Sequence, residues 1–313
     1  NNNKKKKTDE RQQQAHGSSP SRVAPTPQRP EAKATKDRRN APGTEKTTHA
    51  EKEAGDADAD AKTAIREVTF ALDEAGEERM IPVRAHGLAR LAKLAEVEGS
   101  ATRVEIHKRF GQVMELATLG IQSEDSFLYN NAIALMAALA RLRPGKVART
   151  LAGHLEDSDL DQGLRLKIAE VISKICREHG KALSSSKHGV SLLEALLPTT
   201  SDATPNIRAS GLSTIAEVFE LLSSDAADRT TAKVMTKALA ATGDEVAEVR
   251  RGAFFLLERM LVVLGHRATS TVESKTLSEV YALLSKARVA DTDAAARVLA
   301  GRAIEALETK VLR

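Results

Sequence analysis

The strongest constraint on the fold is a helix-start pattern that occurs six times at similar spacing. An apolar residue that begins a helical stripe recurs every 36 to 47 residues, at Val83, Leu128, Leu164, Ile207, Val249 and Ala296. Arg follows it in five of the six copies, and an acidic residue stands six positions before that Arg. These pairs are Glu78 and Arg84, Asp159 and Arg165, Asp202 and Arg208, Asp244 and Arg250, and Asp291 and Arg297. A unit of this length cannot bury its apolar face alone, so the recurrence predicts a stack of similar units.

Each acid and Arg has a structural role in such a stack. The acid is expected in the turn between two antiparallel helices, where a carboxylate accepts N–H groups of the next helix start. The Arg then reaches the acid of its own unit or of a neighbouring unit as a bidentate partner. Because the pairs lie about one unit apart, they cannot converge on one catalytic point. We therefore interpret these ten residues as a structural ladder, from which the second copy departs with Ser123 and Tyr129.

The rest of the pattern predicts an all-α chain with paired helices. A small residue stands four positions after the aligned apolar residue in five copies, at Gly87, Ala132, Gly211, Ala253 and Ala300, which would let paired helices approach closely. Apolar residues recur at three and four positions, as in Val249, Ala253, Leu256, Met260 and Val263. This pattern predicts about twelve helices joined by short connections. Two helices per unit of about 40 residues, with the acid–Arg spacing, resemble HEAT repeats. The prediction is an α-solenoid of about six HEAT/armadillo-type helix pairs over residues 61–313.

Residues 1–60 differ in composition from this repeat region. They hold five of the nine prolines, and Val23 is their one large apolar residue. Such a segment cannot bury enough apolar area to offset its ordering entropy, so we expect a disordered tail. Residues 1–40 carry 11 basic and 4 acidic side chains, including Lys4 to Lys7. These basic runs could be a nuclear-import signal or an arm that binds nucleic acid. We favour the alternative that they belong to a solvated low-complexity linker.

The charge balance and the cysteine count narrow the class of protein. Residues 61–313 carry 34 basic and 33 acidic side chains, so the high pI comes from the tail and no nucleic-acid partner is expected for the repeats. Cys176, the single cysteine, excludes an intramolecular disulfide and favours a reducing compartment. No apolar run is long enough to span a membrane. The chain starts with three Asn and its first Met is Met80, so we expect a piece of a longer protein.

The sequence contains no set of residues typical of catalysis. It lacks a Walker-type loop, G-x-G-x-x-G, G-x-S-x-G and H-E-x-x-H, and it has no second Cys for a zinc site. His179 and His266 adjoin Gly180 and Gly265, so we interpret both as helix caps. Cys176 follows the apolar stripe that ends at Ile175 and is interpreted as a packed, inert thiol. We predict no enzyme, no cofactor, no metal site and no small-molecule substrate.

Several stretches resemble one family more closely than HEAT proteins in general. They are IPVRAHGLARLAKLAE, DSFLYNNAIALMAALARLRPGKV, RLKIAEVISKICREHGKAL, IRASGLSTIAEVFELL and EVRRGAFFLLERMLVVLG, in this order over roughly residues 65–310. They resemble the C-terminal HEAT-repeat region of the Transport and Golgi organization protein 6 family. Its yeast relative is the factor required for nuclear transport of RNA polymerase II.

The resemblance implies a non-catalytic scaffold that binds protein partners. It implies RNA polymerase II subunits or assembly factors as partners, and a cytoplasmic protein that shuttles to the nucleus. In animals the family is also linked to Golgi organisation and secretion, so a membrane-traffic adaptor with peripheral Golgi association is one alternative. A karyopherin-like transport receptor is another. The helices that begin at the six aligned positions are expected to line a groove for an extended segment or helix of a partner.

Overall fold

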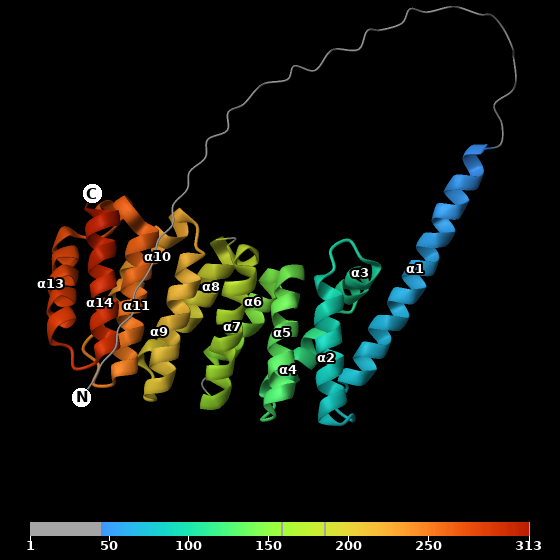
Figure 1. Ribbon diagram of the computed structural model, residues 1–313, viewed down its shortest axis with the longest axis horizontal. Helices are drawn as coiled ribbons and strands as arrows, with labels where there is room; N and C mark the ends of the chain where they lie inside the picture. Colours follow the sequence, from blue (N-terminus) through green and yellow to red (C-terminus); the bar gives the residue numbers. More distant parts are fainter. Residues whose placement is uncertain (1–44, 158, 185, 313) are drawn as a thin grey trace, which may run out of the picture. The chain divides into compact units, whose positions relative to one another are not determined.

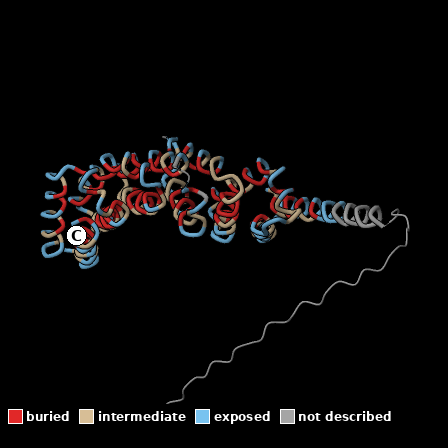
Figure 2. Tube along the Cα trace, turned by 90° about the horizontal axis from the view of Figure 1, so that it is seen from above, coloured by how far each residue is buried: buried red, intermediate tan, exposed pale blue. Residues whose placement is uncertain are grey.

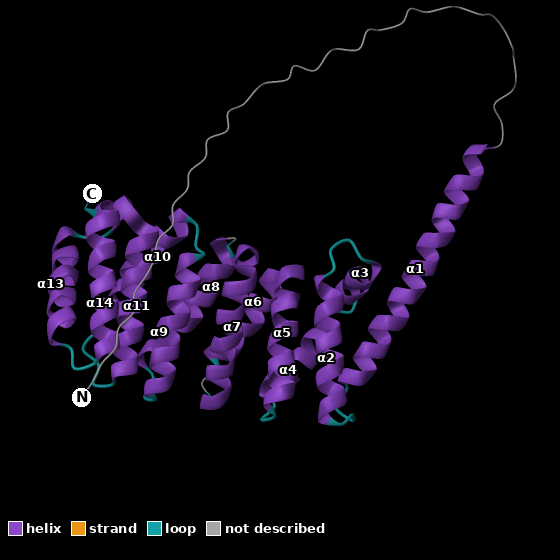
Figure 3. Ribbon diagram, viewed as in Figure 1, coloured by secondary structure: helices purple, strands orange, loops and turns teal. Residues whose placement is uncertain are grey.

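The computed structural model describes residues 45–157, 159–184 and 186–312. Every regular element in these ranges is helical, and no strand occurs among them (Figure 3). The all-α prediction is therefore confirmed. No helix in the described ranges is both long and apolar enough to cross a membrane.

Six helices form one layer, which we call the B layer. Consecutive members of this layer contact one another and lie side by side (Figure 1). They are α2 (Ile81–Glu96), α5 (Ser126–Leu142), α7 (Gln162–Leu183), α9 (Pro205–Glu220), α11 (Ala247–Leu264) and α14 (Ala294–Ala306). Each contains one of the six aligned apolar positions near its start. Pro82 and Pro205 stand in the first turn of α2 and α9, where a missing N–H leaves no helical hydrogen bond unmade.

The preceding helix of each pair belongs to the second layer, the A layer. Its members are α1 (Glu45–Ala75), α3 (Ala101–Lys108) with α4 (Phe110–Gln122), α6 (Pro144–Glu156), α8 (Ser186–Leu196) with the 3-10 turn η1 (Leu197–Ser201), α10 (Ser224–Ala241) and α13 (Ser274–Ala290). Three short elements complete the chain: η2 (Gly265–Arg267) and α12 (Ala268–Thr271) before α13, and the π-helical turn η3 (Leu307–Val311) after α14. Seen end-on, the two layers turn their buried residues toward each other (Figure 2).

One continuous core fills the space between the layers, from Val68 to Val311. The predicted stripe on α11 lies in it, with Val249, Ala253, Leu256 and Met260 fully buried. The small residues of the pattern lie at close helix contacts. A Cβ on Gly87 would lie 2.4 Å from the backbone N of Ala75, and one on Gly211 would lie 2.0 Å from Thr199 Oγ1. Only a residue without a side chain fits at these two points.

Three details of the helices differ from the sequence-based expectation. Helix α1 already begins at Glu45, because Ala, Glu and Lys are frequent in its first half and favour a helix there, whereas its second half carries the buried apolar residues Val68, Ala71, Leu72 and Ala75. The rest of the predicted disordered tail, residues 1–44, lies outside the described residues. The chain bends at Arg109, which separates α3 from α4. Finally, α7 does not stop at Gly180 but kinks at His179 (φ −135°, ψ 29°) and continues to Leu183.

Candidate protein-binding surface

Arginines of the predicted ladder bind the aspartate of the following repeat. Arg208 on α9 donates from Nε and Nη2 to the Asp244 carboxylate at 2.9 and 3.0 Å. Arg250 on α11 binds Asp291 in the same bidentate way, with both distances 2.8 Å. Arg165 Nη1 on α7 lies 3.2 Å from Asp202 Oδ2. These three contacts tie α7, α9, α11 and α14 to one another.

The same arginines also contact their own repeat, through the backbone. Arg208, Arg250 and Arg297 each donate from Nη1 to the carbonyl of the acid six residues earlier, at 2.9, 2.9 and 2.7 Å. Each aspartate of the last repeats thus serves two arginines, one through its side chain and one through its carbonyl. Of the two partners that the sequence left open, the carboxylate of the neighbouring repeat is the one found: the Asp244 carboxylate binds Arg208 across the repeat boundary, and Arg250 binds Asp291.

The aspartates of the ladder also stabilise the turn that leads into the following helix, because each accepts the backbone N–H of that helix's N-cap residue. Oδ1 accepts the backbone N–H two residues later, at 2.8 Å in Asp202, 2.9 Å in Asp244 and 2.8 Å in Asp291. Hydrogen bonds from Arg250 hold the pKa of Asp291 below its ordinary value. Burial acts to raise the pKa of Asp244, but the hydrogen bonds from Arg208 and the Val246 N–H outweigh it and lower that pKa. Both carboxylates are therefore anchored in the charged form.

The first repeats do not share this arrangement. Glu78 is exposed, and in the described part of the chain no ion pair joins it to Arg84, whose Nε is buried without a hydrogen-bond partner. Asp159 donates its backbone N–H to the Asp157 carboxylate at 3.0 Å, while Arg165 Nη2 donates to the Asp157 carbonyl at 3.2 Å. The ladder contacts to a following aspartate thus begin with α7.

Lys167 supplies a different contact where the second repeat has Tyr129 in place of Arg. Its Nζ donates to the Ser123 carbonyl at 2.8 Å and lies 5.4 Å from the centre of the Tyr129 ring. The Tyr129 hydroxyl donates to Glu170, and burial together with this carboxylate raises the tyrosine pKa. Sequence reasoning missed Lys167 and Glu170. One signal could have found them: both lie about one repeat length, or about 40 residues, after the second copy of the pattern, in which Tyr129 replaces Arg.

A second set of ion pairs joins the exposed faces of the last B-layer helices. Arg302 on α14 donates to Glu258 on α11 at 2.7 and 3.1 Å. Arg259 on α11 lies 3.3 Å from Glu220 on α9. Arg251 on α11 holds Asp293, the N-cap of α14, at 2.8 and 2.5 Å. Sequence analysis did not find these pairs, because nothing local marks two charged residues about 40 positions apart as partners.

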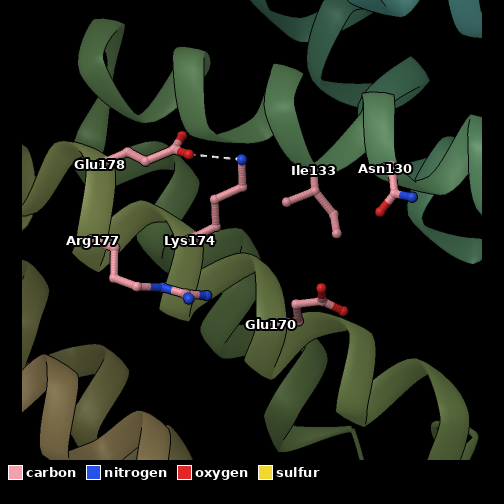
Figure 4. A pocket seen from close by; sticks show the side chains of 6 residues that line it. All are labelled: Asn130, Ile133, Glu170, Lys174, Arg177 and Glu178. Carbon is pink, nitrogen blue, oxygen red and sulfur yellow. Dashed lines mark hydrogen bonds and ion pairs between the residues drawn. The ribbon is translucent and has the colours of Figure 1, made fainter. Parts of the chain in front are cut away.

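Two hollows open on the B layer between such pairs. One of about 300 Å³ lies between α5 and α7 and is lined by Ile133 and by the polar residues Asn130, Glu170, Lys174, Arg177 and Glu178 (Figure 4). Lys174 and Glu178 pair with each other across one helical turn at 2.7 Å. The other hollow, of about 390 Å³, lies between α9, α11 and α14. Both are open surface features of a helical layer and suit contact with another macromolecule more than the enclosure of a small substrate.

The histidines and the cysteine do not form a reactive site in the described ranges. Cys176 is buried, and burial, followed by the nearby Glu217, raises its pKa to about 12, as expected for a packed thiol. His179 stands at the kink of α7, where two helical segments meet, and its Nε2 is buried without a hydrogen-bond partner. His266 follows Gly265, whose φ of 51° ends α11. No group of three His, Cys, Asp or Glu residues in the described part could hold a metal ion.

Residues 71–182 match the family described as "Required for nuclear transport of RNA pol II C-terminus 1". Over these residues the match agrees with the family resemblance that the sequence predicts. The matched segment runs from the end of α1 to the end of α7. The match names nuclear transport of RNA polymerase II, and no comparison supports the Golgi or secretion terms of the sequence-based expectation.

Solved structures with the same fold are repeat proteins. The crystal structure of importin beta in an ammonium sulfate condition is 16% identical, with a TM-score of 0.53, over 83% of this chain and 31% of that one. Kap95p in its complex with RanGDP is 14% identical, with a TM-score of 0.59, over the same 83% and 31%. A HEAT-like repeats protein of Thermococcus onnurineus NA1 is 14% identical, with a TM-score of 0.50, over 81% and 92%. These likenesses confirm the HEAT/armadillo-type solenoid, and the chain spans about a third of the two transport proteins.

Proposed function

We propose that this chain is a non-catalytic repeat scaffold that binds protein partners in the assembly and nuclear transport of RNA polymerase II. The family match over residues 71–182 carries the proposal. The fold supports it, since a stack of helix pairs offers extended helical faces to a partner. Kap95p, which shares the fold, is seen bound to RanGDP in its solved structure. A cytoplasmic protein that enters the nucleus with its partner would fit this role.

The charge of the repeats favours protein over nucleic acid as the partner. Nucleic-acid affinity comes largely from basic side chains that displace counterions, and residues 61–313 have nearly equal numbers of basic and acidic side chains. Many arginines of this region are also held by carboxylates within the stack, as in Arg208, Arg250 and Arg302. These guanidinium groups are not available to a phosphate backbone.

The test is an affinity purification of the full chain from nuclease-treated cytosol, followed by quantitative mass spectrometry. We expect subunits of RNA polymerase II or their assembly factors among the enriched proteins, with recovery that changes little at moderate salt. Recovery of Golgi coat or tether components without polymerase subunits would support the trafficking alternative instead. Binding to Phe-Gly repeats alone would support the karyopherin-like alternative. Salt-sensitive retention of nucleic acid by the repeats would contradict all three.

A further inference from the structure

Three connections between the layers gather positive charge along one edge of the repeat stack, the upper edge in Figure 1. Each joins a B-layer helix to the A-layer helix that follows it, and they are residues 97–109, 141–149 and 179–188. Together they carry nine Lys or Arg and two Glu, a net charge of +7, although residues 61–313 as a whole have 34 basic and 33 acidic side chains. The next such connection, 220–225, has two acidic residues and no basic one. The nearly neutral repeats therefore contain one strongly basic edge, formed by these three connections.

Contacts between the three connections make the basic edge continuous. Arg143 of the second connection donates from Nε and Nη2 to Nε2 and the carbonyl of His107 in the first, at 3.2 and 3.1 Å. The third connection packs on the second, because a Cβ on Gly145 would lie 2.3 Å from the His188 ring. The basic side chains of three successive repeats thus lie on one surface.

Five of the nine cations on the basic edge have no carboxylate partner. The two acids of the edge are already held by the other four cations. Glu98 lies 3.7 and 2.7 Å from Arg103 and Arg141, and Glu105 lies 3.4 and 2.7 Å from Lys108 and Arg109. In the described part of the chain no ion pair is made by the remaining five, which are Arg143, Lys146, Arg149, Lys181 and Lys187. All of these except the half-buried Arg143 are exposed to solvent.

Arg143 is fixed in place without being neutralised. Its two acceptors on His107 are a ring nitrogen and a backbone carbonyl, and neither is a carboxylate. Its guanidinium lies over the buried Phe110 ring, 5.1 Å from the centre, and Lys146 Nζ lies over the same ring at 5.4 Å. Nη1 of Arg143 makes no hydrogen bond within the described residues. A carboxylate that reached it would gain charge-assisted hydrogen bonds at little cost in side-chain entropy, because the arginine is already ordered.

We propose that the basic edge binds a short acidic segment, a run of about six Asp or Glu residues, from the protein partner of the repeats. The inference rests on the proposed function for the source of this segment and adds its chemistry. Neighbouring helices lie about 8–10 Å apart, so three adjacent connections span about 20 Å, the length of about six residues of extended chain. Complementary charge of this kind fixes the register and orientation of a partner on the stack.

The limited extent of the basic edge favours a peptide over a nucleic acid. A phosphate backbone carries a charge at every nucleotide and continues past the three connections. Beyond the third connection it would meet the two acidic residues of 220–225, which repel it. A protein segment can instead place its carboxylates over the basic edge and uncharged residues beyond it.

Fluorescence anisotropy of a fluorescein-labelled peptide with six consecutive glutamates tests the contact on the full chain. The salt concentration is about 0.1 M, where charges more than about 10 Å apart are largely screened and local contacts decide the affinity. The test variant is Arg143→Gln with Lys146→Gln. The matched control is Lys286→Gln with Arg288→Gln, two exposed cations that make no ion pair in the described part of the chain. Both variants keep the basic tail and have the same net charge.

We expect the Arg143 and Lys146 variant to raise the Kd of the peptide about fivefold or more, and the control to change it by less than about twofold. The reason is that the test variant removes cations that the proposed contact uses, whereas the control removes only general positive charge. An equal rise in Kd in both variants would overturn the inference.

Cross-linking of the unaltered chain keeps the test valid even if the double variant folds poorly. A carbodiimide joins a carboxylate to a lysine amine that it touches, and mass spectrometry of the digest locates the product. We expect the hexaglutamate peptide to be joined to Lys146, Lys181 and Lys187 and not to Lys286. Cross-links spread evenly over the exposed lysines of the repeats would overturn the inference.

Two further outcomes separate the acidic segment from other ligands and from the proposed function. An oligonucleotide of six deoxythymidines that binds more tightly than the peptide, and loses affinity in the Arg143 and Lys146 variant, would overturn the inference in favour of a nucleic acid. No binding of the peptide, with polymerase subunits still enriched from cytosol, would overturn the inference and leave the proposed function intact. If the peptide binds at the basic edge but the chain enriches no polymerase component, the proposed function fails and the acidic segment must come from another protein.

Discussion

At the scale of single residues, the pair of Arg250 and Asp291 is the most buried ion pair between repeats in the described chain. The side chains are 12% and 6% exposed. Asp291→Ala would leave the Arg250 guanidinium without its bidentate partner and would free the Asp293 N–H. We expect a loss of about 1–3 kcal/mol in the free energy of unfolding, measured by urea denaturation. The matched change Asp228→Ala removes a pair with Arg267 that is about a third exposed, and it should cost less than about 1 kcal/mol. Equal losses of unfolding free energy in the two variants would mean that burial of the Arg250–Asp291 pair does not increase its contribution to stability.

The same carboxylate predicts how stability depends on pH. Because the hydrogen bonds from Arg250 lower the pKa of Asp291 in the folded chain, this group stabilises the fold above its unfolded pKa. That contribution is lost as the pH falls from about 4 through the lower, folded pKa. We expect Asp291→Asn to be less stable than the unaltered chain at pH 7, with a difference that narrows on acidification. A constant difference from pH 7 to pH 3 would contradict this assignment.

At the scale of helices, the contact of α1 with α2 depends on Gly87. A Cβ there would lie 2.4 Å from Ala75 N and 2.8 Å from the Ala71 carbonyl, and neither backbone atom can move without shifting α1. We expect Gly87→Ala to lower stability by about 1–3 kcal/mol, since strain at the contact outweighs the gain in helix propensity.

Gly153→Ala is the control for this change, because nothing lies within 4 Å of a Cβ at that position in α6. It should raise stability by about 0.5–1 kcal/mol through helix propensity and a less flexible unfolded chain. Thermal melts of the two variants should move in opposite directions. A rise in melting temperature for both would show that α1 does not pack on α2 at this distance.

At the scale of the whole repeat stack, the polar contacts between repeats are unevenly distributed. Arg-to-Asp contacts join α7 to α9, α9 to α11 and α11 to α14. The junction of α5 and α7 has instead the Lys167 and Tyr129 contacts. Since the stability of a repeat protein is approximately a sum over repeats and their interfaces, the two ends should differ in local stability.

Hydrogen exchange measured by mass spectrometry in increasing urea tests this difference. We expect amides of α2 and α5 to open at lower free energy than those of α9 and α11. Helix α11 is held by a bidentate pair on each side, and α9 by a bidentate pair on one side and the Arg165–Asp202 contact on the other. Lys167→Ala should accelerate exchange in α5 and α7 and leave α11 unchanged. Exchange that is uniform along the stack, or fastest in α9 and α11, would refute the uneven distribution.

The sequence alone determined the features that depend on local pattern. The six B-layer helix starts, the small residues at close contacts such as Gly87 and Gly211, and the all-α class all follow from the periodicity of residues within one repeat. These features can be predicted from the sequence because a helix start, a buried apolar stripe and a glycine at a close helix contact each depend on residues only a few positions apart. The packed state of Cys176 follows from the stripe beside it in the same way.

Only the tertiary structure decided which side chains meet across repeats. Whether Arg208 would bind the carboxylate of Asp202 or that of Asp244 is a choice between partners 6 and 36 residues away. The stacking offset of the helix pairs directs Nε and Nη2 to the Asp244 carboxylate, while Nη1 reaches the Asp202 carbonyl. The same offset places Lys167 against Tyr129 and forms the hollow between α9, α11 and α14. These contacts depend on how neighbouring repeats rotate and translate relative to one another, and that geometry results from packing of the whole core rather than from the pattern inside any single repeat.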